Sequence, residues 1–383
     1  MASRFILNPA SYHGYGALDS IKEVVEDRKL KKIVVFVDKF LKDNKISDKV
    51  TDRLDKMENV SYTYFTDIKP NPSITNVLDG LKKLKDFKAD GIIAIGGGSV
   101  MDCAAGSAII NENPEFEDVR SLEGTAATKN YATPIIAIPT TAGTAAEVTI
   151  NYVITDEENQ KKMVCVDPHS IPVAAIVDPK MMESMPYGLT AATGMDALTH
   201  AIEGYITKDA NELSDTFHLK SVELIAKFLK KACENDKDAR EQMALAQYVA
   251  GMGFSNVGLG LVHSMAHPLG ALYDTPHGVA NAILLPAVME YNAEETGEKY
   301  REIARVMGVK DVDKMSQDGY RKAAVDAVKN LSKVVDIPEN LKDIVKKEDI
   351  DFLAQSAMDD ACRPGNPKDP TKEEVIELYK KLI

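Results

Sequence analysis

Four residues with metal-binding side chains stand out in this sequence: Asp196, His200, His263 and His277. Asp196 and His200 are four positions apart, a spacing that places a carboxylate and an imidazole on one face of a helix. The two later histidines come from a second helical segment, so we expect two helical segments to present all four side chains together. The chemistry that this set predicts is the binding of a divalent metal.

The composition around the later histidines strengthens this interpretation. No Asp, Glu, Lys or Arg occurs between Glu241 and Asp274, yet His263 and His267 fall in this stretch at helical spacing. A buried imidazole needs a polar partner, and a dication is an effective one. Three nitrogens and one carboxylate oxygen suit a transition metal better than magnesium or calcium. Taken singly, each histidine is also consistent with an ordinary packing residue.

A second motif, residues 96–102, follows a predicted strand and precedes a predicted helix. Its three consecutive glycines let backbone N–H groups approach an anion, and the helix adds its amino-terminal dipole. A dinucleotide diphosphate fits such a turn. The motif departs from the Gly-x-Gly-x-x-Gly pattern because Met101 takes the place of the third glycine. A tight structural turn is the alternative interpretation.

Three neighbouring features favour a nucleotide. Residues 139–144 follow another predicted strand and offer hydroxyls to phosphate or ribose. Asp38 ends a strand, where a carboxylate can accept hydrogen bonds from ribose hydroxyls and repel a 2′-phosphate, although it is also consistent with a plain turn residue. Lys162 adds a cation, or is simply an exposed lysine.

Composition limits the class of protein. The 383 residues are enough for two domains, and the net charge of −13 argues against nucleic acid or an anionic membrane as partner. The four cysteines show no Cys-x-x-Cys spacing, so neither disulfides nor a cysteine zinc site is expected. Residues 1–9 contain no long apolar run, and we expect no signal peptide and a cytoplasmic location. The uncharged stretch 242–273 has the length of a membrane span, but its polar residues favour a buried helix pair.

The pattern of elements changes near residues 179–186. Before this point, short β-branched runs alternate with helical segments, which is typical of a parallel sheet covered on both faces. The predicted strands are 33–37, 61–65, 91–95, 135–138, 152–155, 163–166 and 174–177, with a helix over 74–84. Beyond it, helical periodicity dominates, near 188–206, 212–230, 239–253, 297–307, 316–334 and 372–382. The sequence therefore predicts an α/β domain at 1–184 and an all-helical domain at 185–383.

These motifs closely resemble the iron-dependent (group III) alcohol dehydrogenase family over the whole chain. The matching segments are 96–102, 139–149, 192–203 and 263–281. Three narrower matches, 118–124, 151–158 and 251–263, are most similar to the members that interconvert lactaldehyde and 1,2-propanediol. Departures from the family pattern include Val100 and Met101 after the glycines and Arg363 after Cys362.

The resemblance implies a role for individual residues. Fe²⁺ would be held by Asp196, His200, His263 and His277. NAD would be held by Asp38, Asn71, Gly97, Gly98, Ser99, Asp102, Thr140, Thr141, Thr144 and Lys162. The substrate would be bordered by Asn151, Phe254 and Cys362. The implied fold is a Rossmann-like amino-terminal domain followed by a helical one, usually paired as a homodimer.

The implied reaction is hydride transfer between NAD(H) and a short-chain aldehyde or alcohol, with the metal polarising the oxygen. No side chain obviously supplies the proton. His267 lies one helical turn beyond His263 and is a candidate relay, while a packing imidazole bonded to a carbonyl is the alternative. Water and the ribose hydroxyl are alternative relays.

Metal identity and reaction class leave further alternatives. The three histidines and the aspartate also suit Zn²⁺, which binds such sites more tightly than Fe²⁺. Another short-chain alcohol or 1,3-propanediol dehydrogenase of the same family is an alternative function. A dehydroquinate synthase-like lyase is disfavoured by the Asp196/His200 pair, because a glutamate is expected in its metal site. A non-catalytic metal- or nucleotide-binding protein is the remaining alternative.

Overall fold

The computed structural model describes residues 4–383. Within them the chain forms two compact units. The first comprises the chain up to Thr141 and Ala145–Ser184, and the second comprises Ala142–Thr144 and Met185–Ile383. The first three residues of the predicted amino-terminal domain lie outside the described residues. Each unit is described separately below.

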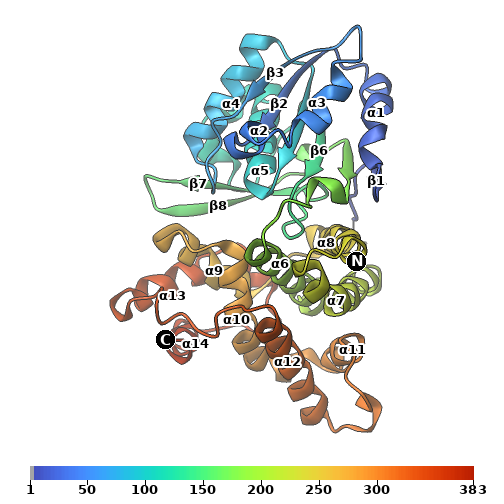
Figure 1. The fold of residues 1–383 in the computed structure, drawn as a ribbon. Coiled ribbons are helices and arrows are strands. Elements are labelled where there is room, and N and C mark those ends of the chain that lie inside the picture. The colour runs from blue at the N-terminus through green and yellow to red at the C-terminus, as the bar shows by residue number, and fades with distance from the viewer. Residues whose placement is uncertain (1–3) are drawn as a thin grey trace. The chain divides into compact units, whose positions relative to one another are not determined.

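The first unit is built on a parallel sheet (Figure 1). Its six strands, in the order β1-β9-β6-β4-β2-β3, are β1 (Ala10–His13), β9 (Ala174–Val177), β6 (Ile135–Pro139), β4 (Gly91–Gly96), β2 (Lys32–Val37) and β3 (Ser61–Phe65). Every neighbouring pair is parallel. The strands of this sheet confirm the predicted runs, and β1 is an additional edge strand whose residues alternate in burial.

Helices cover both faces of this sheet, which is why its central strands are apolar throughout. Ile33, Val35 and Val37 of β2 pack in one cluster with α1 (Ile21–Asp27) and α3 (Asp48–Leu54). Val34 and Phe36 face the opposite way and pack with residues of α4 (Ile74–Phe87) and α5 (Gly98–Glu112). Because side chains alternate along β2, this strand contributes residues to two separate cores, one on each face of the sheet.

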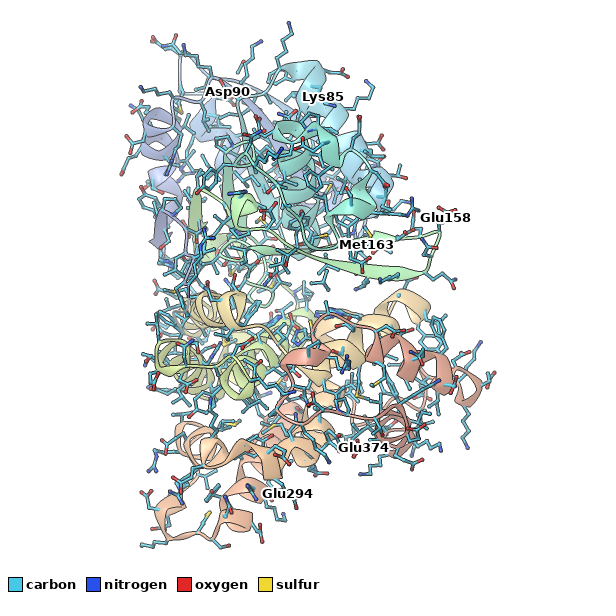
Figure 2. All side chains as sticks on the ribbon, turned by 180° about the vertical axis from the view of Figure 1, so that it is seen from behind. Lys85, Asp90, Glu158, Met163, Glu294 and Glu374 are labelled. Atoms are coloured by element: carbon cyan, nitrogen blue, oxygen red, sulfur yellow. The ribbon has the colours of Figure 1, made fainter. Side chains whose placement is uncertain are left out.

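Two of the predicted strands lie outside the parallel sheet. β7 (Asn151–Asp156) and β8 (Lys161–Val166) form an antiparallel hairpin, and β5 (Gly124–Thr125) pairs with β8. Their burial alternates residue by residue, as expected for a sheet with one packed face. Figure 2 labels Glu158 at the turn of this hairpin and Met163 on β8. Arg120 fixes the hairpin end by donating two hydrogen bonds, at 2.6 and 3.0 Å, to the buried Asp156 carboxylate.

The second unit is helical (Figure 1). Its helices are α6 (Tyr187–Ile206), α7 (Glu212–Cys233), α8 (Lys237–Val257), α9 (Leu261–Tyr273), α10 (His277–Asn292), α11 (Lys299–Val306), α12 (Gln317–Val334), α13 (Ile350–Met358) and α14 (Lys372–Lys381). Six of them match the segments predicted from periodicity. The helices α10 and α13 were not predicted, and α9 continues the uncharged stretch that was expected to form a helix pair.

Glycines allow the central helix α6 to approach its neighbours closely. A Cβ on Gly194 would meet Leu229 at 2.2 Å, and one on Gly278 of α10 would meet the backbone oxygen of Ala192 at 2.3 Å. Distances below 3.0 Å cannot be accommodated unless something moves. The absence of these side chains therefore sets how closely α7 and α10 pack on α6.

Within residues 4–383, no single helix combines the length and apolar character needed to cross a membrane. One bent pair, α8 with α9 at 103°, passes that test when the two helices are taken together, by length and composition only.

Candidate active site

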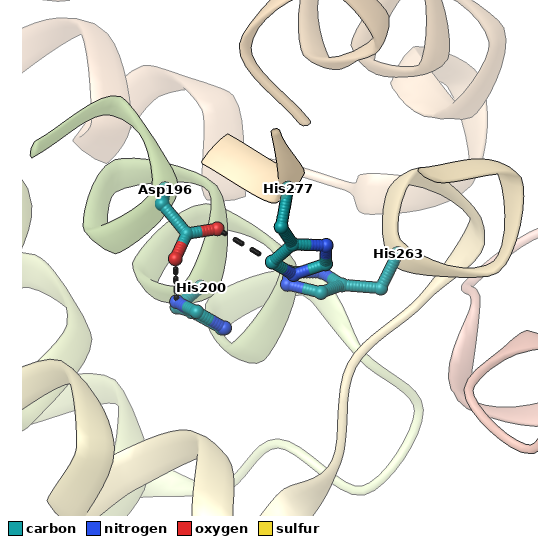
Figure 3. A group of neighbouring side chains, drawn as sticks. All are labelled: Asp196, His200, His263 and His277. Carbon is teal, nitrogen blue, oxygen red and sulfur yellow. Dashed lines mark ion pairs between the residues drawn. The ribbon is translucent and has the colours of Figure 1, made fainter. Parts of the chain in front are cut away.

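The four predicted metal ligands come together inside the helical unit (Figure 3). Their ligand atoms all lie within 4.8 Å of one another. Asp196 and His200 are on α6, His263 is in the first turn of α9, and His277 opens α10. Three helices, not the two segments expected, therefore supply the cluster, because Asp274 takes a left-handed conformation (φ 51°) that ends α9 before His277.

Asp196 lies between two of the imidazoles. Its Oδ2 is 3.9 Å from His200 Nδ1, and its Oδ1 is 3.7 Å from His277 Nε2. These are the two contacts dashed in Figure 3. The separation of four residues between Asp196 and His200 gives the shared helix face that the sequence predicted.

Asn281 is a buried member of the cluster that the sequence interpretation did not single out. Its amide nitrogen lies 2.7 Å from Asp196 Oδ1, 3.2 Å from His263 Nε2 and 3.1 Å from His277 Nε2. An amide –NH2 group donates at most two hydrogen bonds, so it can satisfy only two of these three neighbouring atoms. Asn281 lies one turn after His277 on α10, and that spacing was its only sequence signal.

Three of the four side chains, all except that of His277, are buried. Asp196 is 2% exposed and His263 is 1% exposed. Burial, followed by the nearby His263, lowers the pKa of His200 well below its usual value, so the ring is neutral and can act as a ligand. Phe254 stacks on the His200 ring with the ring centroids 4.3 Å apart and 13° between planes, which holds the imidazole in place.

The donor set fits a divalent transition metal. Three imidazoles and one carboxylate converge, three of the four side chains being buried, and His200 Nδ1 makes no hydrogen bond among the described residues. A buried carboxylate with several unprotonated acceptors is costly without a cation. The absence of a thiolate from this set distinguishes it from cysteine-based structural zinc sites.

A carboxylate outside the four predicted ligands supports His263. Glu203 on α6 places Oε2 2.6 Å from His263 Nδ1, and both side chains are 2% exposed. Its sequence signal was weak, because Glu203 lies 60 positions from the histidine that it contacts.

His267, the candidate proton relay, has a carboxylate partner of its own. Its Nδ1 lies 2.7 Å from Asp360 Oδ2, so the partner is a side chain and not the backbone carbonyl considered as the alternative. Burial alone would raise the pKa of Asp360, but His267 and the hydrogen bonds from Cys362 lower it to about 2. Burial, followed by Asp360, raises the pKa of Cys362 well above its usual value, so this thiol stays protonated. The His267 and His277 rings stack with centroids 5.5 Å apart.

The glycine turn lies in the α/β unit, at the carboxyl end of β4. Gly97 is the N-cap of α5, and the helix begins at Gly98. The backbone N–H of Thr140, at the end of β6, donates to Gly96 at 2.9 Å. A Cβ on Gly97 would come within 3.1 Å of Thr141 Oγ1. The turn and the threonine loop therefore lie together at the end of adjacent strands, where the sequence placed them.

Two further predicted cofactor residues are linked to the glycine turn. Lys162 Nζ donates to Asn71 Oδ1 at 2.9 Å, and the backbone N–H of Asn71 donates to Ser99 Oγ at 3.2 Å. Asn71 has a positive φ of 54°. Burial raises the pKa of Asp102 to about 8, although a backbone hydrogen bond from Val153 and the charge of Lys162 act in the opposite direction. These residues form one connected polar group beside the helix start.

The remaining predicted residues are distributed over both units. Asp38 caps α2 (Lys39–Asp43), because its Oδ1 accepts from the backbone N–H of Leu41 at 2.9 Å. One oxygen of the proposed ribose ligand thus has a structural role. Asn151 begins β7 and lines a small cavity with Asp102, whereas Thr144 belongs to the helical unit.

Sequence models of one family match both units. The iron-containing alcohol dehydrogenase model matches residues 8–179, and the model described as "Fe-containing alcohol dehydrogenase family, C-terminal" matches residues 190–383. Together they account for most of the chain.

Individual relatives agree with this assignment. The chain is 57% identical over 380 residues to lactaldehyde reductase of Escherichia coli K12, covering 99% of both chains. A crystal structure of a 1,3-propanediol oxidoreductase superposes with a TM-score of 0.96 at 37% identity, covering 100% of both chains. The NAD⁺ complex of sulfoacetaldehyde reductase from Bifidobacterium kashiwanohense superposes with a TM-score of 0.88 at 30% identity, covering 100% of this chain and 99% of that one.

Proposed function

The chain belongs to the iron-containing alcohol dehydrogenase family, and from that premise we propose that it reduces lactaldehyde to 1,2-propanediol with NADH and catalyses the reverse oxidation. The observation that carries the proposal is the buried cluster of one carboxylate and three imidazoles in a chain of this family. The choice of substrate is supported by the 57% identity to the lactaldehyde reductase of E. coli.

We propose Asp196, His200, His263 and His277 as the ligands of Fe²⁺, the metal that the family implies. A divalent metal bound there would polarise the carbonyl of the aldehyde, while NADH would supply the hydride to its carbon. The chain's own contribution is to bring the four donors within 4.8 Å of one another, with Asp196, His200 and His263 buried and His277 partly exposed. Phe254 and Asn281 assist, the first by stacking on His200 and the second by contacting three of the donors.

His267 is the proposed proton relay. Asp360 contacts its Nδ1, so Nε2 is the ring nitrogen that remains to exchange a proton with the alcohol oxygen. The pair therefore fixes the orientation of the ring, one helical turn beyond His263.

The cofactor is assigned to the group around the glycine turn. Gly97, Gly98 and Ser99 lie at the start of α5, where free backbone N–H groups and the helix dipole favour the diphosphate of NAD. The connected polar side chains around the turn supply further donors and acceptors. The residues that we assign to NAD are Asp38, Asn71, Gly97, Gly98, Ser99, Asp102, Thr140, Thr141, Thr144 and Lys162.

The residues that we propose to border the substrate are Asn151, Phe254 and Cys362. Phe254 already covers one face of His200, which limits the bulk of an aldehyde approaching that side. The similarity to a 1,3-propanediol oxidoreductase makes 3-hydroxypropanal the second candidate substrate.

One assay tests the proposal. Metal-free protein is supplied anaerobically with Fe²⁺ and NADH, and nicotinamide absorbance is followed with lactaldehyde or 3-hydroxypropanal. We expect the larger kcat/KM for lactaldehyde. A larger value for 3-hydroxypropanal would replace the proposed substrate, and no oxidation of NADH with any short-chain aldehyde would overturn the proposed activity.

The identity of the metal has its own test. Fe²⁺ held by three histidines and one aspartate is exposed to oxidation, so activity lost in air should return on anaerobic addition of Fe²⁺. A zinc enzyme would be stable in air and unaffected by Fe²⁺. The response of aerobically purified protein to each metal separates the two.

We also propose a cytoplasmic homodimer, on the family resemblance alone. The mass of the protein in solution, measured by light scattering, tests the assembly, and fractionation of cells tests the location.

A further inference from the structure

We infer that Glu203 is a positioning residue that fixes the ring of His263 for metal binding, by accepting a hydrogen bond from Nδ1–H and so leaving Nε2 as the atom that binds the metal. The inference rests on the proposed metal centre. It assigns a role to a carboxylate that is not among the four proposed ligands.

The contact geometry supports a strong hydrogen bond. Glu203 Oε2 is 2.6 Å from His263 Nδ1, and the two side chains are each only 2% exposed. A neutral imidazole carries one proton, and a carboxylate partner draws it to the nitrogen that it faces. His263 Nε2 is then the unprotonated nitrogen, and it faces the Asn281 amide nitrogen at 3.2 Å.

The carboxylate is itself held in place from the other side. Glu203 Oε1 accepts from the backbone N–H of Val262 at 2.6 Å, and Oε2 accepts from that of His263 at 3.3 Å. These are the first, unpaired N–H groups of α9, and the positive end of the helix dipole stabilises the buried anion. Glu203 on α6 thus caps α9 and orients its first-turn histidine through the same carboxylate.

The N-cap of α9 is shaped to admit this carboxylate. Gly260 has no side chain to cap the helix, and a Cβ there would lie 3.0 Å from both Glu203 Oε1 and Asn366 Oδ1. Asn366 Oδ1 accepts from the backbone N–H of Leu261 at 3.2 Å. Side chains from distant segments therefore replace the local cap, and the missing Cβ leaves room for them.

The same helix provides a matched comparison. His267 lies one turn beyond His263 and has a similar bond, 2.7 Å from its Nδ1 to Asp360 Oδ2. His267 is not one of the four clustered donors, whereas His263 is. If the Glu203 carboxylate orients a metal ligand, its removal should weaken metal binding, whereas removal of the Asp360 carboxylate should not.

The experiment uses the full-length metal-free protein and Co²⁺, whose visible absorption reports imidazole coordination. Co²⁺ affinity is measured by competition with a chelator in the wild type, Glu203→Gln and Asp360→Asn, together with the melting temperature of each metal-free protein. Gln keeps an oxygen for the backbone N–H groups, so metal-free stability should change little. Since such outer carboxylates commonly contribute about 10–100-fold to metal affinity, we expect a loss of that size in Glu203→Gln and less than about threefold in Asp360→Asn.

Each result is decisive. Unchanged Co²⁺ affinity in Glu203→Gln, or an equal loss in both variants, would overturn the role of Glu203. A wild type that binds no Co²⁺ would overturn the proposed metal centre itself. If Glu203→Gln fails to fold, Gly260→Ala provides the second variant, because its new Cβ would press on Glu203 Oε1. It should lower Co²⁺ affinity and shift the visible spectrum, and wild-type values for both would contradict the inference.

Discussion

The two units hold their candidate sites in different ways. In the α/β unit, the glycine turn and the threonine loop follow adjacent parallel strands, so the order of the strands alone brings them together. In the helical unit, three helices must pack correctly before Asp196, His263 and His277 meet. The first site is supplied largely by backbone at strand ends, and the second by buried side chains. Disturbing helix packing should therefore damage metal binding selectively.

The largest effect is expected when a proposed metal ligand is removed. His263→Ala or His277→Ala should lower kcat/KM for lactaldehyde by about 1000-fold or more, since loss of the metal removes several kcal/mol of transition-state stabilisation. NADH affinity should remain close to that of the wild type, because the glycine turn belongs to the other unit. Metal content and NADH fluorescence titration measure the two effects.

The proposed independence of the two sites is contradicted if either variant retains activity without metal, or if it loses NADH binding while remaining folded. The first result would remove the metal from the reaction, and the second would show that the two sites are not held independently.

The next largest effect is expected from a substitution that changes how α10 packs on α6. Gly278→Ala places a Cβ 2.3 Å from the Ala192 backbone oxygen and 3.3 Å from the Asp196 Cβ. The start of α10, which carries His277, must move, and such overpacking costs about 1–3 kcal/mol of the free energy of unfolding. Metal affinity should fall with stability, as measured by urea unfolding and by metal competition.

Gly188→Ala is its control. This exposed position in the first turn of α6 has nothing within 4 Å of the new Cβ. Stability should rise by about 0.4–1 kcal/mol, with metal affinity unchanged. Equal effects of the two substitutions would refute the argument from packing.

The helical unit should also be sensitive to acid through His218. This residue of α7 is fully buried, and a Cβ on Gly204 of α6 or Gly253 of α8 would lie within 2.4 Å of its ring. Burial, followed by the charge of Lys299, lowers its pKa to about 3. The unfolded chain binds a proton near pH 6.5 and the folded chain does not, so this contribution to stability is complete above pH 6.5 and is lost as the pH falls toward 3.

Between pH 7 and pH 5 the wild type should therefore lose about 2 kcal/mol of unfolding free energy through this residue. His218→Leu should lose less over the same interval, and urea unfolding at both pH values measures the difference. The same pH dependence in both proteins would show that His218 does not titrate as inferred.

The smallest expected effect concerns cofactor choice in the α/β unit. Replacing Asp38 should raise the preference for NADPH relative to NADH by about tenfold, because like-charge repulsion of a 2′-phosphate is removed. Asp38 also caps α2, so Asp38→Asn, which keeps a cap, is compared with Asp38→Gly. The ratio of kcat/KM values is measured for both cofactors. An unchanged ratio in both variants would mean that Asp38 does not meet the ribose.

The central strands could be predicted because β2, β4, β6 and β9 are continuous apolar runs. The edge strand β1 could not, since Ala10–His13 contains no such run and alternates in exposure. The hairpin strands were found, but not their separation from the main sheet, because pairing partners are not encoded in a local pattern. Helix α10 escaped prediction since its apolar residues surround the whole helix and leave no stripe.

The candidate metal site was partly predictable for a similar reason. The spacing of four residues between Asp196 and His200 is enough to predict that they share a helix face. The roles of Glu203 and Asp360 depend on histidines 60 and 93 positions away, which no local pattern reveals. The position of Asp38 after a strand predicted ribose binding. The hydrogen bond by which it caps α2 is seen only in the folded chain.

The uncharged stretch between Glu241 and Asp274 makes the chain prone to aggregation before it is folded. Until α8 and α9 are buried, a long apolar segment without charged gatekeepers is available to other copies, a known route to aggregation. His263 lies within this segment, so a metal bound at the proposed centre favours the state in which the segment is hidden. Metal supply during expression should then govern the yield of dispersed protein as well as its activity.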